Sequence, residues 1–366
     1  MLYSISRLFA RCLLVFAGAS LPLSSALAQP SGAQGDDFLY RAVQNDTLSN
    51  IAATYTTNGQ NWRTLQSLNN IPDPRTLPIG KMLRIPFAMI PQVPGNAAVI
   101  HVAGEAWLDR EPLHAGDSVA EGGAIRTGDT GFVTLRLSDG STLTIPSNAS
   151  VAVQRLRVFQ NVPLTDTIIS IDKGSLESQV APQNTGVGRF EVRTPVSITG
   201  VRGTRLRVHA STDGARSEVI EGAAQLESGS SDSARLAANQ GAAVSPEGRM
   251  LGVRTLLPAP QLPEIPPSDH SGRLSFPAVG GASSYLIRIA TDPEGRQLID
   301  SRSTEQPSAT YSRSGSERYL LVRAIDSNGI GGHDGMTTIP AGRVLLTSNG
   351  TAVRSGDSGV IRLIDY

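Results

Sequence analysis

The segment from residue 40 to residue 87 constrains the fold more than any other part of the chain, because its apolar residues recur at helical spacing within a short unit. One apolar stripe of a helix is predicted by residues at i, i+3, i+4 and i+7, which are Leu48, Ile51, Ala52 and Tyr55. Asp46 or Thr47 is suited to accept a hydrogen bond from the free N–H groups of the first turn. Asn58-Gly59 tolerates the left-handed geometry that ends many helices.

A second helix is predicted over residues 61–69 by apolar side chains at helical spacing, Trp62, Leu65 and Leu68. The two prolines of Ile71–Pro74 prevent its continuation. Strands at 39–43 and 82–85 complete the order strand, helix, helix, strand. The unit is close to the lower size limit of a self-standing domain.

These residues resemble the LysM module, a βααβ unit that binds N-acetylglucosamine-containing glycans such as peptidoglycan and chitin. The family's GDTL appears as Asn45–Leu48, its Trp and LxxLN as Trp62 and Leu65–Asn69, and its closing PGxxLxIP as Pro78–Pro86. Asn45 replaces the usual Gly, and Ile79 is inserted between the Pro and the Gly. We therefore expect a module spanning residues 38–87, with rims that differ from those of a typical member.

The resemblance implies that the sugar lies between the loop after the first strand and the loop after the second helix. The glycan-binding residues implied in this sequence are Asn45, Asp46, Thr47, Asn70, Ile71, Pro72 and Asp73. Short loops offer backbone donors and acceptors to the amide and hydroxyl groups of the sugar. The alternative is that Asp46 is only a helix cap and that Pro72–Pro74 is only a turn.

Residues 1–28 have the pattern of a secretory signal peptide. Arg7 and Arg11 precede an apolar run at 12–23, and Ala26-Leu27-Ala28 provides small residues for cleavage. The run is too short to span a bilayer, so we expect an exported, periplasmic protein with no membrane span in the mature chain. Cys12 is the only cysteine and would be removed, which leaves no disulfide.

The net charge is zero, with 32 basic and 32 acidic residues, so nothing in the charge favours nucleic acid or an anionic membrane as a partner. The 37 Gly, the 23 Pro and only 5% aromatic residues indicate a turn-rich, mainly β chain of several domains. Prolines mark two boundaries, at 88–97 and at 258–271. The second is predicted to be a stiff polyproline linker, extended over about 30 Å, that holds its neighbours apart.

Residues 99–246 alternate apolar and polar residues with a period of two. Val133, Leu135 and Leu137 face one way, and Asp139-Gly140 turns the chain towards Leu143. Further strands are expected at 151–153, 168–171, 189–193, 205–208 and 217–220. We expect one all-β domain, which is a sandwich, a roll or a short solenoid.

This region resembles the periplasmic part of FecR-type proteins, transducers of iron-siderophore signals. The likeness lies in Gly116–Gly128, in Leu137–Ser141 and above all in Thr194–Thr204. The cytoplasmic arm and membrane helix of a FecR transducer are replaced here by a signal peptide and a LysM-like module. The resemblance therefore implies the fold and a role in binding or display, not signalling to a sigma factor. Arg202 and Arg205 are either a carboxylate clamp or solvated arginines of a turn.

Residues 272–340 resemble a fibronectin type III sandwich, through Leu274–Ile289 and Tyr319–Asp326. Phe276 stands where that family has a Trp and is expected to fill the core between the sheets. Residues 341–366 are expected to form one or two further strands of unassigned position.

No pattern indicates an enzyme, a metal site or a cofactor. The five histidines show no paired spacing. Ser358 lies in a Gly-Asp-Ser-Gly turn near the C-terminus without the histidine context of a serine protease, and the carboxylates of residues 38–87 are too sparse for a glycosidase. The prediction is a multi-domain chain in which a small α+β module is followed by mainly β domains.

We expect a non-enzymatic cell-wall protein that binds peptidoglycan through residues 38–87 and displays two β domains. One alternative is an envelope sensor whose FecR-like domain recognises a protein partner. Another is an accessory subunit that brings a separate hydrolase to the wall.

Overall fold

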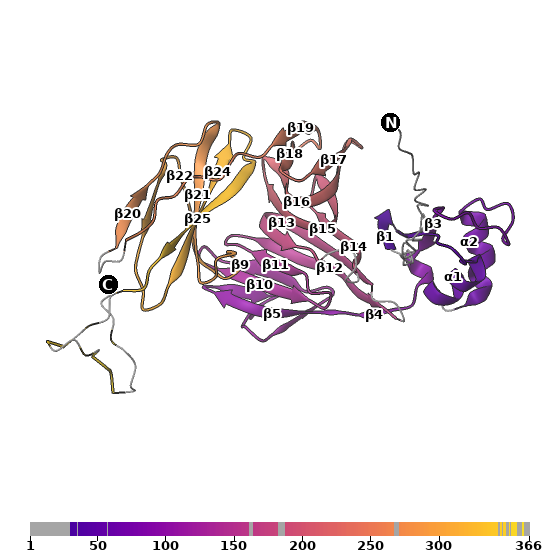
Figure 1. Ribbon diagram of the computed structural model, residues 1–366, viewed down its shortest axis with the longest axis horizontal. Coiled ribbons are helices and arrows are strands. Elements are labelled where there is room, and N and C mark those ends of the chain that lie inside the picture. Colours follow the sequence, from indigo (N-terminus) through magenta and orange to yellow (C-terminus); the bar gives the residue numbers. More distant parts are fainter. Residues whose placement is uncertain are drawn as a thin grey trace, which may run out of the picture.

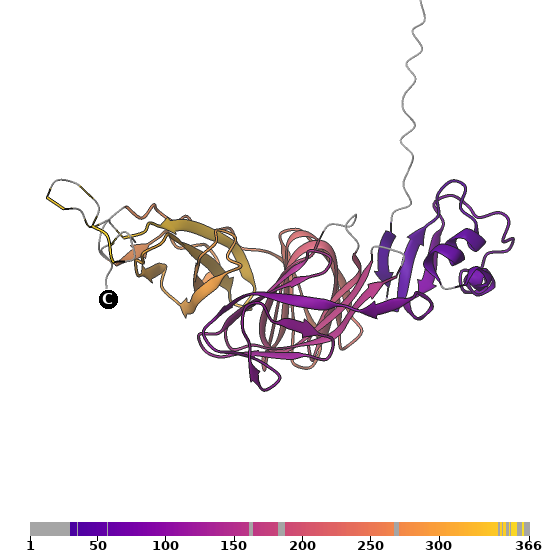
Figure 2. The same ribbon diagram turned by 90° about the horizontal axis from the view of Figure 1, so that it is seen from below.

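The computed structural model describes residues 30–34, 36–56, 58–160, 164–181, 187–266 and 271–342, together with isolated positions beyond residue 342. The expected signal peptide at 1–28 and Ser358 lie outside the described residues, as does most of the C-terminal segment. Three units lie in a row, with the small helical module at one end and a β sandwich at the other (Figures 1 and 2). None of the helices within these ranges is long and apolar enough to cross a membrane.

The first unit has the predicted βααβ order and one additional strand. Its elements are β2 (Asp37–Arg41), α1 (Leu48–Tyr55), the 3₁₀ turn η1 (Gly59–Asn61), α2 (Trp62–Leu68), β3 (Met82–Pro86) and the 3₁₀ turn η2 (Phe87–Met89). Strand β1 (Pro30–Gln34), which no periodicity indicates, pairs antiparallel with β2 and completes a sheet in the order β1-β2-β3.

The predicted apolar stripe of α1 packs onto this sheet. Leu48, Ile51 and Ala52 are buried, and Tyr55 packs at the edge of the same core. The helix ends earlier than Asn58-Gly59, contrary to the sequence prediction. Thr56 is extended and its side chain bonds to the carbonyl of Ala52 at 2.7 Å, so a side-chain cap replaces the left-handed glycine cap.

The middle unit is one rolled sheet that encloses its own core (Figure 1). Its first strands are β4 (Gln92–Pro94), β5 (Asn96–Ala103), β6 (Ala106–Leu108), β7 (Glu111–Pro112), β8 (Ser118–Ala120), β9 (Ala124–Thr127), β10 (Phe132–Leu137) and β11 (Thr142–Ile145). The longer strands follow: β12 (Ser150–Phe159), β13 (Thr165–Gln179), β14 (Val187–Arg193), β15 (Ser197–Ser211), β16 (Gly214–Ser228), β17 (Ser233–Ala237), β18 (Gln240–Val244) and β19 (Met250–Thr255).

This sheet extends beyond the expected range of 99–246 at both ends. The proline-containing segment 88–97 is not a free linker, because β4 pairs with β12 and β5 already begins at Asn96. The predicted hairpin is present: β10 pairs with β11, and Gly140 has a φ of +85° in the turn between them.

The third unit is a two-sheet sandwich of the type expected for residues 272–340. Its strands are β20 (Gly272–Ser275), β21 (Ala282–Ala290), β22 (Leu298–Thr304), β23 (Ser308–Tyr311), β24 (Arg318–Asp326) and β25 (Gly331–Ile339), and its sheets have the orders β20-β23 and β22-β21-β24-β25. Phe276 is buried in the core and packs edge-on against Tyr285, as its expected role requires.

The segment predicted to be a stiff spacer does not hold these two units apart, which corrects that prediction. It lies along the sandwich: the N–H of His333 donates to the carbonyl of Leu257 at 2.8 Å, and Thr337 donates to the carbonyl of Pro263 at 3.1 Å. Ile265 is buried in the core of the sandwich. The apolar residues between the prolines therefore dock the segment on the sandwich, although the proline count predicted a stiff spacer that keeps the two units apart.

Both junctions between units are packed and charged. At the first, the ring of Phe87 stacks on that of Phe159. The buried Arg189 of the middle unit pairs with Asp36 of the first unit at 3.0 Å, and the buried Asp166 holds Arg189 from within the middle unit by a bidentate ion pair of 2.5 and 2.7 Å. At the second, Phe132 packs with Leu298 and Leu321. The three units consequently form one continuous body in which each is positioned by its neighbour.

Candidate functional site

The candidate glycan site is built on the turn that leads into α1. Thr47 is extended, and its hydroxyl accepts a hydrogen bond from the N–H of Asn50 at 3.1 Å, which makes Thr47 the helix cap. Leu48 follows directly and is buried in the core. The exposed Thr47 is thus fixed in place by the helix that it begins.

Asp46 holds the same turn from inside. Its Oδ2 accepts a hydrogen bond from the N–H of Val43 at 2.7 Å and another from the hydroxyl of Tyr40 at 2.8 Å. Burial, and then the neighbouring Asp46, raises the pKa of Tyr40 far above its usual value, so the phenol remains a donor at all ordinary pH values. Asp46 therefore shapes the loop. It is not the helix cap that the alternative interpretation of the sequence assigned to it, because Thr47 caps the helix.

Asn45 explains one departure from the family pattern. Its φ is +71°, a left-handed conformation that glycine adopts without strain and that asparagine tolerates better than most residues. The loop therefore keeps its shape although Asn replaces Gly, and the exposed amide of Asn45 adds a polar group to the rim.

The second loop follows α2 and also contains a left-handed residue, Asn70, with a φ of +50°. Ile71 is only 5% exposed and packs in the core, while the side chain of Gln66 donates to its carbonyl at 3.0 Å. Pro72 and Asp73 are exposed, and Asp73 accepts a hydrogen bond from the N–H of Arg75 at 2.9 Å. The structure therefore places Ile71 as the anchor of this loop and leaves Asn70, Pro72 and Asp73 on the surface.

Ile79 is an insertion relative to the family pattern and is not among the residues that the resemblance implies as glycan-binding. Its side chain is 71% exposed, the most of any large hydrophobic residue in the described ranges. The adjacent Gly80 donates to the carbonyl of Ala42 at 2.8 Å, and Ala42 donates to the carbonyl of Lys81 at 2.9 Å. Ile79 thus projects beside the strand end that leads into the 43–47 loop, where it offers an apolar contact.

The chemistry of this module is that of a binding surface. Desolvation of the buried Tyr40 and the half-buried Tyr55 raises the pKa of both phenols, and neither is available as a base. Among the residues that the structure describes, no group of three or more His, Cys, Asp or Glu side chains could hold a metal ion. The exposed groups are amides, hydroxyls, a proline ring and one carboxylate, which suit an uncharged polar ligand.

The second candidate, the pair Arg202 and Arg205, falls on an irregular part of β15. The register with β16 shifts between these two residues, and Gly203 has a φ of +57°. This is a β-bulge inside a long strand and not the turn of the alternative reading. The side chain of Arg202 lies outside the described residues, so the clamp remains a hypothesis.

Comparison with known families divides the chain in the same way. The LysM domain family matches residues 40–86 and the FecR protein family matches residues 123–225. Each covers less than half of the chain, so each describes a part of it. The chain carries a LysM domain, which indicates glycan binding, and a FecR region, and domains of both kinds are typical of the cell envelope. A search of curated proteins found no match.

Solved structures resemble the two β units only distantly. A candidate anti-sigma factor from Parabacteroides distasonis is 18% identical over 36% of this chain and 59% of its own length, with a TM-score of 0.30. The chain therefore spans about three fifths of that structure. The fn3 domain of human collagen alpha-1(XX) is 18% identical over 27% of this chain and 97% of its own, with a TM-score of 0.22. Fibronectin(III)-like modules of Clostridium thermocellum CbhA are 12% identical over 47% of this chain and 88% of theirs, at 0.19. At such scores, the architecture rests on the strand order of the chain itself.

Proposed function

We propose that this chain is a non-enzymatic cell-envelope protein that binds peptidoglycan non-covalently through its LysM domain and displays the two β units from the wall. The observation that carries the proposal is the LysM match combined with two exposed loops that the domain holds in fixed conformations. Thr47 caps a helix in one loop, and Ile71 anchors the other in the core. Fixed loops lose little conformational freedom on binding, which favours affinity.

One short binding surface contacts only a few sugars, so a single domain binds glycan weakly, with a Kd on the order of 10–1000 μM. The wall repeats the same sugars many times, and rebinding increases retention. The exposed residues proposed to bind carry one charge, that of Asp73, so ionic strength has little influence.

Competition tests this proposal directly. The full mature chain is bound to purified sacculi, and chitin-type N-acetylglucosamine oligomers are added at increasing concentration. The proposal expects the oligomers to displace the protein, with similar curves at low and moderate salt. Retention that resists the oligomers but disappears with salt would instead reveal a charge-driven surface.

The proposed location is the periplasm, with the chain at the cell wall. It is supported by the leader pattern at 1–28 and by the two envelope-type domains. N-terminal analysis of the protein from a cell fraction tests it, and the expected result is a chain that begins near residue 29.

A regulatory role is the second candidate, and the FecR match is the observation that favours it. The middle unit is then a sensor that recognises an envelope partner. A variant with a blocked LysM surface distinguishes the two functions. A scaffold loses its role when it no longer binds the wall, whereas a sensor still responds to its signal.

A further inference from the structure

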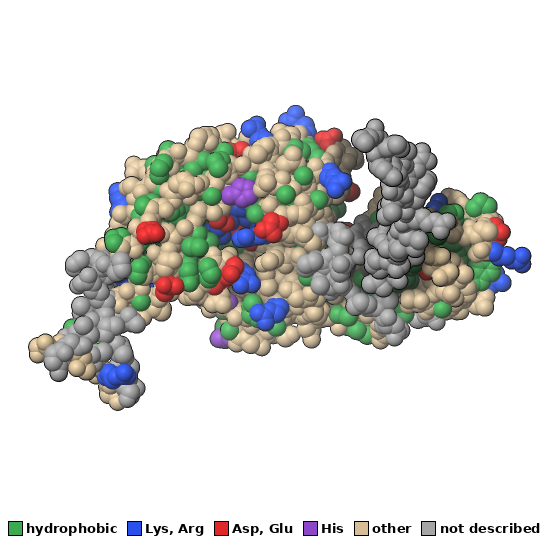
Figure 3. Space-filling view, viewed as in Figure 1, with side chains coloured by type: hydrophobic (Ala, Val, Ile, Leu, Met, Phe, Trp, Pro, Cys, Tyr) green, Lys and Arg blue, Asp and Glu red, His purple; other side chains and the backbone are tan. Residues whose placement is uncertain are grey.

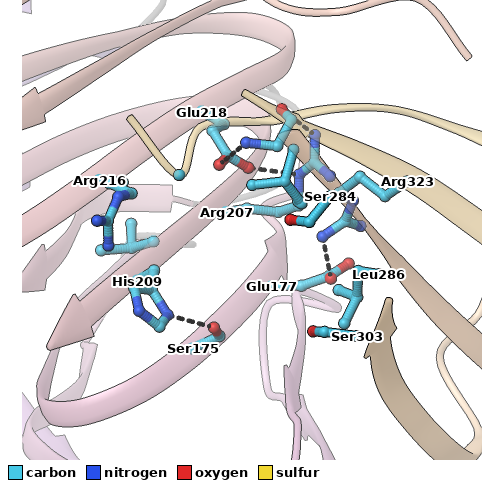
Figure 4. Close-up of a pocket in the computed structure, with 14 residues that line it drawn as sticks. Ser175, Glu177, Arg207, His209, Arg216, Glu218, Ser284, Leu286, Ser303 and Arg323 are labelled. Carbon is cyan, nitrogen blue, oxygen red and sulfur yellow. Dashed lines mark hydrogen bonds and ion pairs between the residues drawn. The ribbon is translucent and has the colours of Figure 1, made fainter. Parts of the chain in front are cut away.

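A pocket of about 310 Å³ opens where the middle unit meets the sandwich, and its first lining residue, Ser175, lies 89 residues after the end of the LysM match. The middle unit contributes residues of β13, β15 and β16 to it, and the sandwich contributes residues of β21, β22 and β24 (Figure 4). Charged side chains gather around this junction on the visible face of the molecule (Figure 3). Pockets between domains are frequent ligand sites.

Two parallel rows of side chains cross the sheet beneath the pocket. In the first row, Glu177, Arg207 and Glu218 are register partners on β13, β15 and β16. In the second row, which lies two residues away from the first on each of these antiparallel strands, the partners are Ser175, His209 and Arg216. Because side chains alternate along a strand, both rows point to the same face, towards the sandwich.

The first row is neutralised within the protein. Arg207 pairs with Glu218 at 3.1 Å, and Arg323 from the sandwich pairs with Glu177 at 2.9 Å. Arg288 and Asp334 add one positive and one negative charge behind them, and they pair with each other at 2.6 Å. This row forms a closed, charge-balanced floor.

The second row is not neutralised. Arg216 donates through its Nε to the carbonyl of Asn328 at 2.5 Å, and it forms no ion pair with an acidic side chain in the part of the chain that the structure describes. Beside it, His209 shares a hydrogen bond of 2.9 Å with Ser175. Burial, and then the charge of Arg216, lowers the pKa of His209, so the imidazole is neutral and leaves Arg216 as the charge of this row. The pocket lining thus carries three arginines against two glutamates, one positive charge in excess.

The first row also contains a donor without an acceptor. The Arg207 side chain is 6% exposed, and its Nη1 makes no hydrogen bond within the described residues. A buried donor without a partner is destabilising, so the floor of the pocket is held at a cost in stability. Charged groups held at such a cost are more frequent at binding sites than elsewhere.

The remaining lining describes the rest of the ligand. Ser284 and Ser303 add hydroxyls from the sandwich wall, and Leu286 and Ile325 add apolar patches from the same wall. Figure 4 shows Arg216 and His209 on one side, with Ser303 and Leu286 on the other. One excess positive charge, several hydroxyl partners and small apolar patches suit a small monoanion that carries hydroxyl groups.

We propose that this pocket binds a small hydroxylated monocarboxylate, such as a sugar acid, with its carboxylate on Arg216 and its hydroxyl groups on Ser175, His209 and the serines of the sandwich. Arg216 presents a fork of donors that matches the two oxygens of a carboxylate. The neutral His209 provides one further donor or acceptor. The site is separate from the LysM surface and needs both β units to be in place.

Isothermal titration calorimetry of the full mature chain tests the proposal with D-glucuronate, D-gluconate and N-acetylmuramate as probes. The expected result is binding of at least one acid with a Kd on the order of 0.1–1 mM that weakens as salt increases, and no binding of uncharged D-glucose. Absence of binding by all three acids, or equal binding of glucose, overturns the proposal.

The variant Arg216→Gln removes the charge and keeps a polar side chain of similar reach. It is expected to weaken the binding of the acid at least tenfold, whereas Arg235→Gln, the same change at an exposed position of β17, leaves it unchanged. Equal loss in both variants, or unchanged binding in Arg216→Gln, contradicts the assignment. Thr47→Trp with Asp73→Arg blocks the LysM surface and is expected to leave the acid's Kd unchanged, so this site and the wall-binding site fail independently.

Discussion

The phenolic hydroxyl of Tyr40 donates a hydrogen bond of 2.8 Å to Oδ2 of Asp46, and this bond fixes the loop that we propose to contact glycan. The same Asp46 oxygen accepts the N–H of Val43 at 2.7 Å. The carboxylate that seemed from the sequence to be a ligand contact or a helix cap therefore first supports the loop, and its removal is expected to alter stability as well as binding.

The first prediction concerns this support. Asp46→Ala leaves the hydroxyl of Tyr40 and the N–H of Val43 without their acceptor and is expected to cost about 1.5–3 kcal/mol. Urea unfolding of the full chain measures it, with Asp73→Ala as the matched control. Among the described residues, the carboxylate of Asp73 bonds to the exposed N–H of Arg75 alone. Equal costs for the two changes would show that Asp46 does not hold the loop.

The second prediction concerns the junction between the LysM domain and the middle unit. Asp166 is fully buried and accepts from Arg189 at 2.5 and 2.7 Å and from Arg155 at 3.1 Å. Asp166→Ala leaves a buried guanidinium with too little negative charge and is expected to destabilise the chain by about 3–5 kcal/mol.

The control for this change is Asp300→Ala, which breaks an exposed pair with Arg302. An exposed pair contributes at most about 1 kcal/mol. If thermal denaturation gave the same midpoint for Asp166→Ala and Asp300→Ala, the first junction would not depend on its buried charges.

The third prediction is a loss of stability in acid. Desolvation raises the pKa of Glu177, but Arg288 and Arg323 outweigh it and lower that pKa to about 2 from its ordinary value of 4.5. A carboxyl with a lowered folded-state pKa contributes stability above pH 4.5 that is lost as the pH falls towards 2. The shift corresponds to a contribution on the order of 3 kcal/mol.

Unfolding midpoints measured from pH 6 down to pH 2 test this prediction. The wild-type chain is expected to lose stability steeply below about pH 4.5, and Glu177→Gln is expected to be less stable at pH 6 but to show a shallower loss. Parallel pH profiles for the two proteins would mean that Glu177 does not retain its charge by pairing across the second junction.

Local pattern predicted most of the elements because burial on one face repeats along the sequence. The stripe of Leu48, Ile51 and Ala52 is buried as predicted, and so are the alternating residues of β10. Trp62 lies on the predicted inner face of its helix but packs only at the edge of the core. Leu65 on the same helix is fully buried. Helical spacing identifies the inner face of a helix but not how deep each side chain lies.

Contacts between segments that are distant in sequence or in different units could not be predicted from these local patterns. Thr134 is fully buried although it lies on the polar face of β10, because its hydroxyl bonds to the carbonyl of Arg296 in the sandwich. Strand β1 has no periodicity and forms by pairing with β2. Arg216 and His209 are seven residues apart in a sequence of ordinary polarity and become neighbours only through strand register. Each of these features depends on tertiary pairing, which the periodicity of a single sequence does not predict.

The proposed glycan site was also predicted in part from the sequence and in part only from the structure. The family motif identified the two loops, whereas their internal roles required the structure, which separates Ile71 as a buried anchor from the exposed Pro72 and Asp73.

Ile79 is exposed, and the next residue, Gly80, donates to the carbonyl of Ala42 at the end of the strand that leads into the first loop. We predict that Ile79→Ser weakens glycan binding about threefold to tenfold by removing apolar contact, with little change in unfolding midpoint, since the side chain is already exposed.

The measurement that tests the central claim most directly is sacculus binding by the full chain with Thr47→Trp and Asp73→Arg. These changes place bulk on both loops and leave the core of the domain untouched. Because Thr47 caps α1, the matched control is Thr47→Ala with Asp73→Ala, which loses the same cap without added bulk. The account predicts at least a tenfold loss of retention for the bulky variant, about 1.4 kcal/mol or more, and a clearly smaller loss for the alanine control, which gives up two side-chain contacts but leaves the surface open. A folded bulky variant that binds sacculi as well as the control would contradict the claim that this surface holds the chain on the wall.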